Sequence, residues 1–92
     1  MKIDTNAKPR QQRGFRLETL ESELLLYDPG QTKTIYLNPT ASLIWQMCDG
    51  KHTVDEIIAL LQESYPDAAE GIPRDVAAAL DQFSEHGAIE VD

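Results

Sequence analysis

The stretch LNPTASLIWQMCDGKHTVDEI, residues 37–57, contains two helix starts and one helix stop. Asn38 followed by Pro39 is typical of a helix start, because an Asn side chain accepts from free amides of the first turn and Pro loses no hydrogen bond there. Gly50 predicts the helix end, since glycine readily adopts the left-handed conformation common there. The T-V-D-E run from Thr53 fits a capping box for a second helix. The spacing leaves room only for a tight corner, which sets the angle between the two helices.

Apolar side chains at helical spacing extend this prediction to three helices. The first begins at Pro39, the second runs from Thr53 to about Ser64, and the third opens at Pro73 and ends at Gly87. The apolar stripes comprise Ala41, Ile44, Trp45 and Cys48 in the first helix, Val54, Ile57, Ile58, Leu61 and Tyr65 in the second, and Val76, Ala79, Leu80 and Phe83 in the third.

Residues before Asn38 follow a period of two, which is typical of strands. The pattern predicts three short antiparallel strands over residues 15–19, 23–27 and 33–37, joined by turns at the ESE run and at DPGQ, residues 28–31. In the third strand Ile35 and Leu37 should point to one face, and Thr34 and Tyr36 to the other. Residues 88–91 are expected to form an optional short strand that pairs with the sheet.

A three-stranded antiparallel sheet followed by three helices predicts an α+β winged helix-turn-helix fold, with the strands covering one side of a trihelical core. The 92 residues suit one compact domain. Five of the eight cations lie in the first sixteen residues, against one acidic residue. We therefore predict a flexible basic N-terminal arm over residues 1–14 and a folded domain over residues 15–92.

The charge and composition argue against several classes of partner. The formal net charge is −8, whereas nucleic-acid affinity comes largely from cations that neutralise phosphates. Nucleic acid and anionic membrane surfaces are both disfavoured. No apolar run approaches the roughly 18 residues of a membrane-spanning helix, and residues 1–14 lack the apolar stretch of a signal peptide. A single cysteine fits a reducing compartment, so we expect a cytoplasmic protein with no membrane partner.

No arrangement of side chains predicts catalysis. Cys48 and His52 are four residues apart, but Asp49 and Gly50 interrupt the helix between them, and Cys48 belongs to the apolar stripe. Acidic residues are abundant, yet they occupy polar helix faces rather than an apolar pocket that would shift a pKa. Two separated histidines and one cysteine make a poor metal site. We expect no enzyme activity, no metal and no cofactor.

Two features suit binding instead. If the strand Lys33–Leu37 lies at the edge of the sheet, its free amides and carbonyls could accept a strand from another chain. In the third helix, the VAAAL run at residues 76–80 has small side chains that would let a peptide approach closely. An equally weighted alternative is that Ala77 and Ala78 serve only as good helix formers.

Four runs of residues resemble the PqqD family: GFRLE at residues 14–18, LLLY before the turn, LNPTASLIWQMCDGKHTVDEIIALLQESYP at residues 37–66, and RDVAAALDQFSEHGAI at residues 74–89. The most specific part is LN-x-x-A-x-x-I/L-W followed by DG-x-x-T-V-x-E-I. The resemblance covers the chain from about Pro9 to its C-terminus.

The resemblance implies a non-catalytic peptide-recognition element of ribosomally made, post-translationally modified peptides. Such a protein binds the leader of a precursor peptide and presents it to a radical S-adenosylmethionine enzyme, in pyrroloquinoline quinone biosynthesis or a related pathway. In related domains the leader adds as a strand beside the third strand and packs against the third helix. The peptide-binding residues carried over to this chain are Lys33, Thr34, Ile35, Tyr36, Leu37, Arg74, Ala77, Ala78, Asp81 and Ser84.

Within that set, Arg74 is expected to contact an acidic leader residue and Asp81 a basic one. Two other readings remain open at this point. A winged-helix transcription regulator shares the outline, although Asp75, Asp81 and Glu85 on the third helix would repel phosphate. A structural subunit of an enzyme complex, or a homodimer, could equally use an apolar sheet edge.

Overall fold

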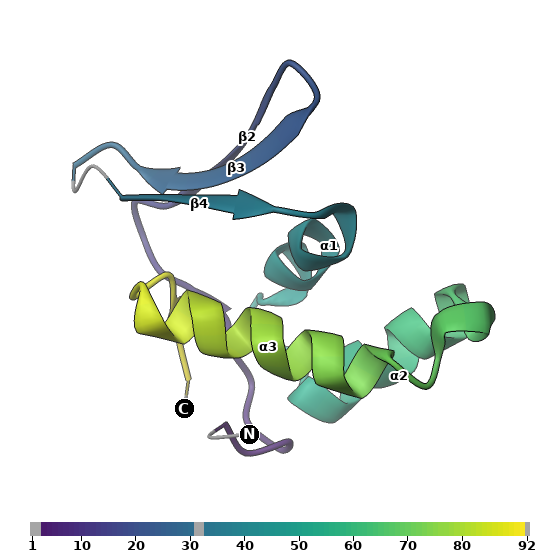
Figure 1. The fold of residues 1–92 in the computed structure, drawn as a ribbon. Helices are drawn as coiled ribbons and strands as arrows, with labels where there is room; N and C mark the ends of the chain where they lie inside the picture. The colour runs from purple at the N-terminus through teal and green to yellow at the C-terminus, as the bar shows by residue number, and fades with distance from the viewer. Residues whose placement is uncertain (1–2, 31–32, 92) are drawn as a thin grey trace.

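The computed structural model describes residues 3–30 and 33–91 of the chain. A three-stranded sheet lies on one side of three helices, which is the α+β winged-helix arrangement that the sequence predicts (Figure 1). The elements in order are β1 (Arg10–Gln11), β2 (Arg16–Leu20), β3 (Glu23–Asp28), β4 (Lys33–Leu37), α1 (Pro39–Met47), α2 (Val54–Ser64), the 3-10 helix η1 (Pro66–Ala68), α3 (Ile72–Glu85) and β5 (Ile89–Glu90).

The main sheet has the order β2-β3-β4, and both strand pairs are antiparallel. Leu17 lies opposite Leu26, which in turn lies opposite Ile35. This row faces the helices: Leu26 is fully buried and Ile35 is 2% exposed. Because β4 pairs only with β3 among the described strands, it forms one edge of the sheet.

The two faces of β4 are those that the alternation predicts. Ile35 and Leu37 are buried, whereas Thr34 and Tyr36 are exposed. The DPGQ turn before the strand is supported by a hydrogen bond from the Gly30 amide to the Asp28 carboxylate, at 2.9 Å. Gln31, also in the predicted turn, lies outside the described residues.

Both helix starts in the opening stretch are confirmed. The Asn38 side chain accepts from the Ala41 amide at 2.7 Å, which caps α1. Thr53 and Glu56 form the reciprocal capping box at the start of α2. The helix stop differs by a few residues, since α1 ends at Met47 and Gly50 follows with φ +78°. Gly50 therefore shapes the corner after the helix rather than its last turn.

The core is continuous between the sheet and the helices. Val76, Leu80 and Phe83 on α3 are fully buried, and they meet the buried stripes of α1 and α2. Trp45 on α1 contacts Phe83 and Phe15 edge-on, with ring centroids 5.7 and 6.3 Å apart. Edge-on pairs of this kind stabilise beyond the area they bury, so α1, α3 and the start of the sheet are fixed to one another.

The N-terminal residues differ from the predicted flexible arm. Ile3, Ala7 and Pro9 are buried against the helices. The amides of Val54 and Asp55, in the first turn of α2, donate to backbone carbonyls of Ala7 and Thr5, each at 3.0 Å. The segment thus satisfies helix amides that would otherwise need water. Met1 and Lys2 of the predicted arm lie outside the described residues.

The last strand also differs from the expectation. β5 pairs with β1, with Arg10 opposite Glu90 and Gln11 opposite Ile89, and not with the three-stranded sheet. The N-terminal segment is therefore held at the C-terminal end of the chain, and β4 keeps an unpaired side within the described structure. Across residues 3–30 and 33–91, no helix has the length and apolar character needed to span a membrane.

Candidate functional site

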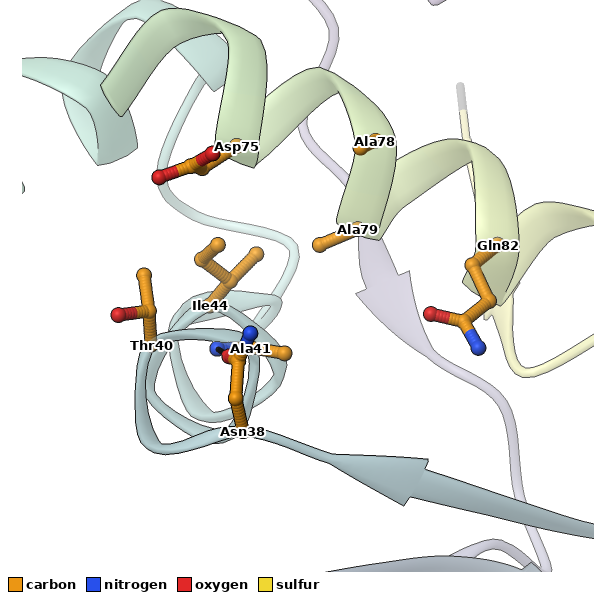
Figure 2. A pocket seen from close by; sticks show the side chains of 8 residues that line it. All are labelled: Asn38, Thr40, Ala41, Ile44, Asp75, Ala78, Ala79 and Gln82. Carbon is orange, nitrogen blue, oxygen red and sulfur yellow. Dashed lines mark hydrogen bonds between the residues drawn. The ribbon is translucent and has the colours of Figure 1, made fainter. Parts of the chain in front are cut away.

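A hollow of about 210 Å³ lies between the start of α1 and one face of α3 (Figure 2). We call it the groove, and it is lined by Asn38, Thr40, Ala41, Ile44, Asp75, Ala78, Ala79 and Gln82. Both figures show β4 passing into α1, with the start of α1 lying between β4 and α3. The groove therefore lies where the edge strand passes into a helix.

Small side chains keep the groove open. Asp75, Ala78, Ala79 and Gln82 follow the spacing i, i+3, i+4, i+7, so they share one face of α3. Ala78 is exposed and Ala79 is 6% exposed. The helix can therefore approach a ligand closely at its middle, where a larger side chain would fill the space.

The two ends of the groove are polar. Figure 2 shows the Asp75 carboxylate projecting from α3 on the side where Thr40 lies, and Gln82 at the other end of the same helix face. The Asn38 side-chain oxygen is already engaged by the Ala41 amide. The middle, formed by alanines and Ile44, is apolar. This lining suits one small or medium apolar side chain with polar groups beside it.

The edge of β4 leads directly into the groove. The strand ends at Leu37, and Asn38 both follows it and lines the groove. An edge strand leaves the amides and carbonyls of alternate residues free to pair with another strand. A strand added to β4 would therefore run into or out of the groove.

The structure separates the residues predicted for binding into three groups. The backbone of Lys33–Leu37 forms the sheet edge, with Thr34 and Tyr36 exposed and Ile35 and Leu37 buried. Ala78 lines the groove beside that edge. Arg74, Ala77, Asp81 and Ser84 do not line it.

Asp81 and Ser84 instead line a second hollow of about 140 Å³, together with Ile3 and Glu85. That hollow lies on the side of α3 that faces the N-terminal segment. Arg74 is exposed, and Ala77 is half-buried on the helix. The predicted α3 set is thus divided between two faces of the helix, and its roles stay predictions.

Sequence reasoning missed Asp75 and Gln82 as groove residues, along with the first turn of α1, and it included Ala79 only as part of the small-residue run at residues 76–80. A signal for them was present in the periodicity. The buried stripe of α3 passes through Val76, Leu80 and Phe83. Residues one position before Val76 and Phe83 border that stripe on one side, and these are Asp75 and Gln82.

The thiol, carboxylate and imidazole groups of the corner between α1 and α2 make hydrogen bonds within the protein. Cys48 is fully buried, and its thiol donates to the Ile44 carbonyl with 3.2 Å between sulfur and oxygen. Burial, with a smaller effect of Asp49, raises the pKa of the Cys48 thiol to about 12. The thiol therefore stays protonated at neutral pH, in a state that is a poor nucleophile.

Asp49 has the opposite shift. The Lys51 amide donates to its carboxylate at 2.8 Å, and His52 contacts it at 3.0 Å. These contacts lower the pKa of Asp49 to about 2, with the Lys51 hydrogen bond the largest cause. Within residues 3–30 and 33–91, no three His, Cys, Asp or Glu side chains gather in a group that could hold a metal ion.

The outer face of the sheet carries apolar side chains that no helix covers. Leu20 is 63% exposed and Tyr36 is 68% exposed. Leu25 lies opposite Tyr36, and Tyr27 lies opposite Thr34 on the same face. A strand added beside β4 would extend this face and place one of its side chains across from Tyr36.

Comparison with known proteins identifies a matching family and similar proteins. The family Coenzyme PQQ synthesis protein D (PqqD) matches residues 23–89. A PqqA binding protein of Klebsiella pneumoniae (strain 342) is 41% identical over 71 residues, covering 74% of this chain and 73% of that protein. A PqqA binding protein of Stutzerimonas stutzeri (strain A1501) is 37% identical over 92 residues, covering 97% of this chain and 96% of that protein.

A solved structure also shares the fold. Lasso peptide synthetase B1, complexed with the leader peptide, superimposes with a TM-score of 0.73 and 23% sequence identity. The match covers 90% of this chain and 98% of that chain. The likeness therefore extends over the sheet and the helices together.

Proposed function

The chain belongs to the PqqD family, and from this premise we propose that it binds the leader of a precursor peptide and presents it to a maturation enzyme of the radical S-adenosylmethionine class. The pathway is pyrroloquinoline quinone biosynthesis or a related modified-peptide pathway. The protein acts in the cytoplasm by binding alone, and the chemistry belongs to the enzyme.

The observation that carries this proposal is the unpaired edge of β4 beside the groove. Backbone pairing along the edge supplies affinity with little dependence on peptide sequence, while the groove distinguishes side chains. The names of the relatives support it, since both are PqqA binding proteins. The shared fold of lasso peptide synthetase B1 shows that this architecture occurs in a protein solved with a leader peptide.

The proposed contacts follow from the geometry. The strand that contains Thr34, Ile35 and Tyr36 contributes the free backbone groups of its alternate residues along the edge, and Ala78 contributes the close approach on α3. An exposed ion pair contributes only about 0–1 kcal/mol, so apolar contacts in the groove and on the outer sheet face dominate affinity. A contact with Arg74, Ala77, Asp81 or Ser84 requires the peptide to continue beyond the groove around α3.

The test is a titration of isotopically labelled protein with the leader of a precursor encoded near its gene. Amide resonances of Lys33–Leu37 and of the groove face of α3 should shift. Two matched peptides, N-methylated at alternate residues in opposite phases, isolate backbone pairing, because only one phase removes the amides that face β4. One phase should abolish binding and the other should retain it. Equal binding by both, or shifts that leave β4 unchanged, would overturn the proposed mode.

A second copy of the chain is the competing occupant of the same edge, because the edge and Tyr36 are exposed in one molecule. Light scattering during the titration separates the two cases. We expect one protein to bind one peptide. A homodimer that persists after the peptide is added would assign the edge to the structural-subunit reading.

A further inference from the structure

Asp75 is the one charged residue among the eight that line the groove. It lies in the first turn of α3, is exposed, and projects its carboxylate from the helix on the side where Thr40 lies (Figure 2). No ion pair of Asp75 with residues 3–30 or 33–91 is described, and the ion pairs found there are Arg10–Glu90 and His52–Asp49. The groove therefore has a negative charge at one end that forms no ion pair within the described residues.

The remaining lining contains no cation. Asn38 and Gln82 contribute neutral amides, Thr40 a hydroxyl, and the other four residues apolar surface. Five of the protein's eight cations lie in the first sixteen residues, and none of those that the structure describes lines the groove. An acidic side chain entering the groove would meet repulsion, whereas a lysine or arginine would meet an unpaired carboxylate.

We propose that Asp75 makes the groove selective for a leader segment in which a lysine or arginine lies two residues from a small or medium apolar residue. The apolar side chain enters between the two helices over Ala78 and Ala79, and the basic side chain reaches the carboxylate. Successive residues of a strand point to opposite faces, so two side chains that both enter the groove belong to residues two apart, and their register on β4 is fixed. This inference rests on the proposed function and names the peptide class it recognises.

A purely structural role for Asp75 is the competing explanation. An acidic residue in the first turn of a helix is favoured by the helix dipole, and Asp75 has that position in α3. A dipole role changes the stability of the free protein. A recognition role changes affinity in a way that depends on the charge of the peptide. Asp81 is a carboxylate on the same helix that lies outside the groove, because it lines the hollow beside Ile3.

The experiment is a double-mutant cycle at low ionic strength. Wild-type protein and Asp75→Asn are each titrated with the leader and with leaders in which one basic residue at a time is replaced by alanine. We expect Asp75→Asn to weaken binding of the unmodified leader by up to about fivefold, the range of an exposed ion pair. The leader that lacks the basic residue in contact with Asp75 should bind wild-type protein and Asp75→Asn equally, because the ion pair is absent in both complexes. Glu63→Gln removes one exposed carboxylate from α2 and is the charge control.

The reversed pair gives the sharpest result. Asp75→Lys should bind the unmodified leader more weakly still, and should recover affinity for a leader whose selected basic residue is replaced by glutamate. Raising the salt to about 1 M should reduce the wild-type preference, since the screening length falls to about 3 Å. The peptide-side substitutions test the contact in the wild-type protein, so the result does not depend on a variant folding.

The outcomes separate the inference from the proposed function. If wild-type protein binds the leader but Asp75→Asn behaves like Glu63→Gln, the inference is wrong and the proposed function stands. If a leader without any basic residue binds as tightly as the natural one, the inference is again wrong. If wild-type protein binds no leader, the proposed function fails, and the inference fails with it.

Discussion

The ring of Trp45 contacts the ring of Phe83 edge-on, with 5.7 Å between their centroids and 72° between their planes. Trp45 belongs to α1 and Phe83 to α3, which form the two walls of the groove. The distance between the walls is thus set by an aromatic contact in the core beneath them. A ligand meets a groove whose shape already exists before binding, which lowers the entropic cost of association.

Replacing Trp45 by alanine should remove this support. A buried tryptophan cut to alanine costs about 3–5 kcal/mol, and the whole free energy of unfolding of a domain is about 5–15 kcal/mol. Urea denaturation should therefore show a variant close to unfolding. Trp45→Phe keeps a ring and should lose less. Tyr65→Ala is the control, because Tyr65 is 48% exposed; equal losses at Tyr65 and Trp45 would contradict the structure.

Cys48 should make stability fall at alkaline pH. Burial raises the pKa of the folded thiol from 9.0 to about 12. A raised pKa stabilises the folded state fully below pH 9, and the contribution is lost as pH rises through the folded value. Unfolding free energies measured at about pH 8 and about pH 10.5 should differ more in wild type than in Cys48→Ala, which has no thiol to titrate. The same decrease in both proteins would show that Cys48 is not responsible.

Asp49 should make the stability of the protein fall at acidic pH. Hydrogen bonds, chiefly from the Lys51 amide, lower the pKa of Asp49 from 3.8 to about 2 in the folded state. A lowered pKa gives stability above the unfolded value, and this stability is lost as pH falls through the folded one. Asp49→Asn keeps an acceptor for the amide without a titrating group, so its stability should fall less steeply than wild type between about pH 4 and 2. Parallel curves would exclude the assignment.

The parts of the fold that local chemistry specifies could be predicted from the sequence. Asn38, Thr53 and Glu56 form caps with neighbours three residues away, so the chain sequence itself contains both partners of each bond. The alternation of apolar and polar residues likewise predicted the two faces of β4, and the residues expected to point inward, Ile35 and Leu37, are buried. In each case the determining contact is local, and one face of the element is apolar.

The N-terminal segment could not be predicted in this way. Its contacts with α2 are backbone hydrogen bonds from Val54 and Asp55 to carbonyls some fifty residues earlier. Any residue can supply a backbone carbonyl, so the side chains around Ala7 carry no pattern that would predict these hydrogen bonds. The pairing of β1 with β5 has the same character, because two residues per strand are too few to show alternation.

The groove was predicted only at Ala78 and along β4. The small residues of α3 were visible, but which of them faces the strand depends on how α3 rotates against α1. That rotation is set by contacts such as Trp45 with Phe83. Helical neighbours such as Asp81 lie about 60° or more around the axis from the groove residues, because each residue advances the helix by about 100°.

A side chain that fills the groove should abolish leader binding without unfolding the protein. Ala78 is exposed and lines the groove, so Ala78→Phe places a ring in the space that the leader needs. Ala59 is an exposed alanine of α2 outside the groove, which makes Ala59→Phe a matched control with the same loss of helix propensity, about 0.5 kcal/mol. Calorimetric titration should show at least about a tenfold loss of affinity for Ala78→Phe, a change of about 1.4 kcal/mol, and near wild-type affinity for Ala59→Phe. Thermal unfolding should give similar midpoints for the two variants. Equal affinities would mean that the leader lies elsewhere on the protein, and the edge of β4 would then have to act without the groove.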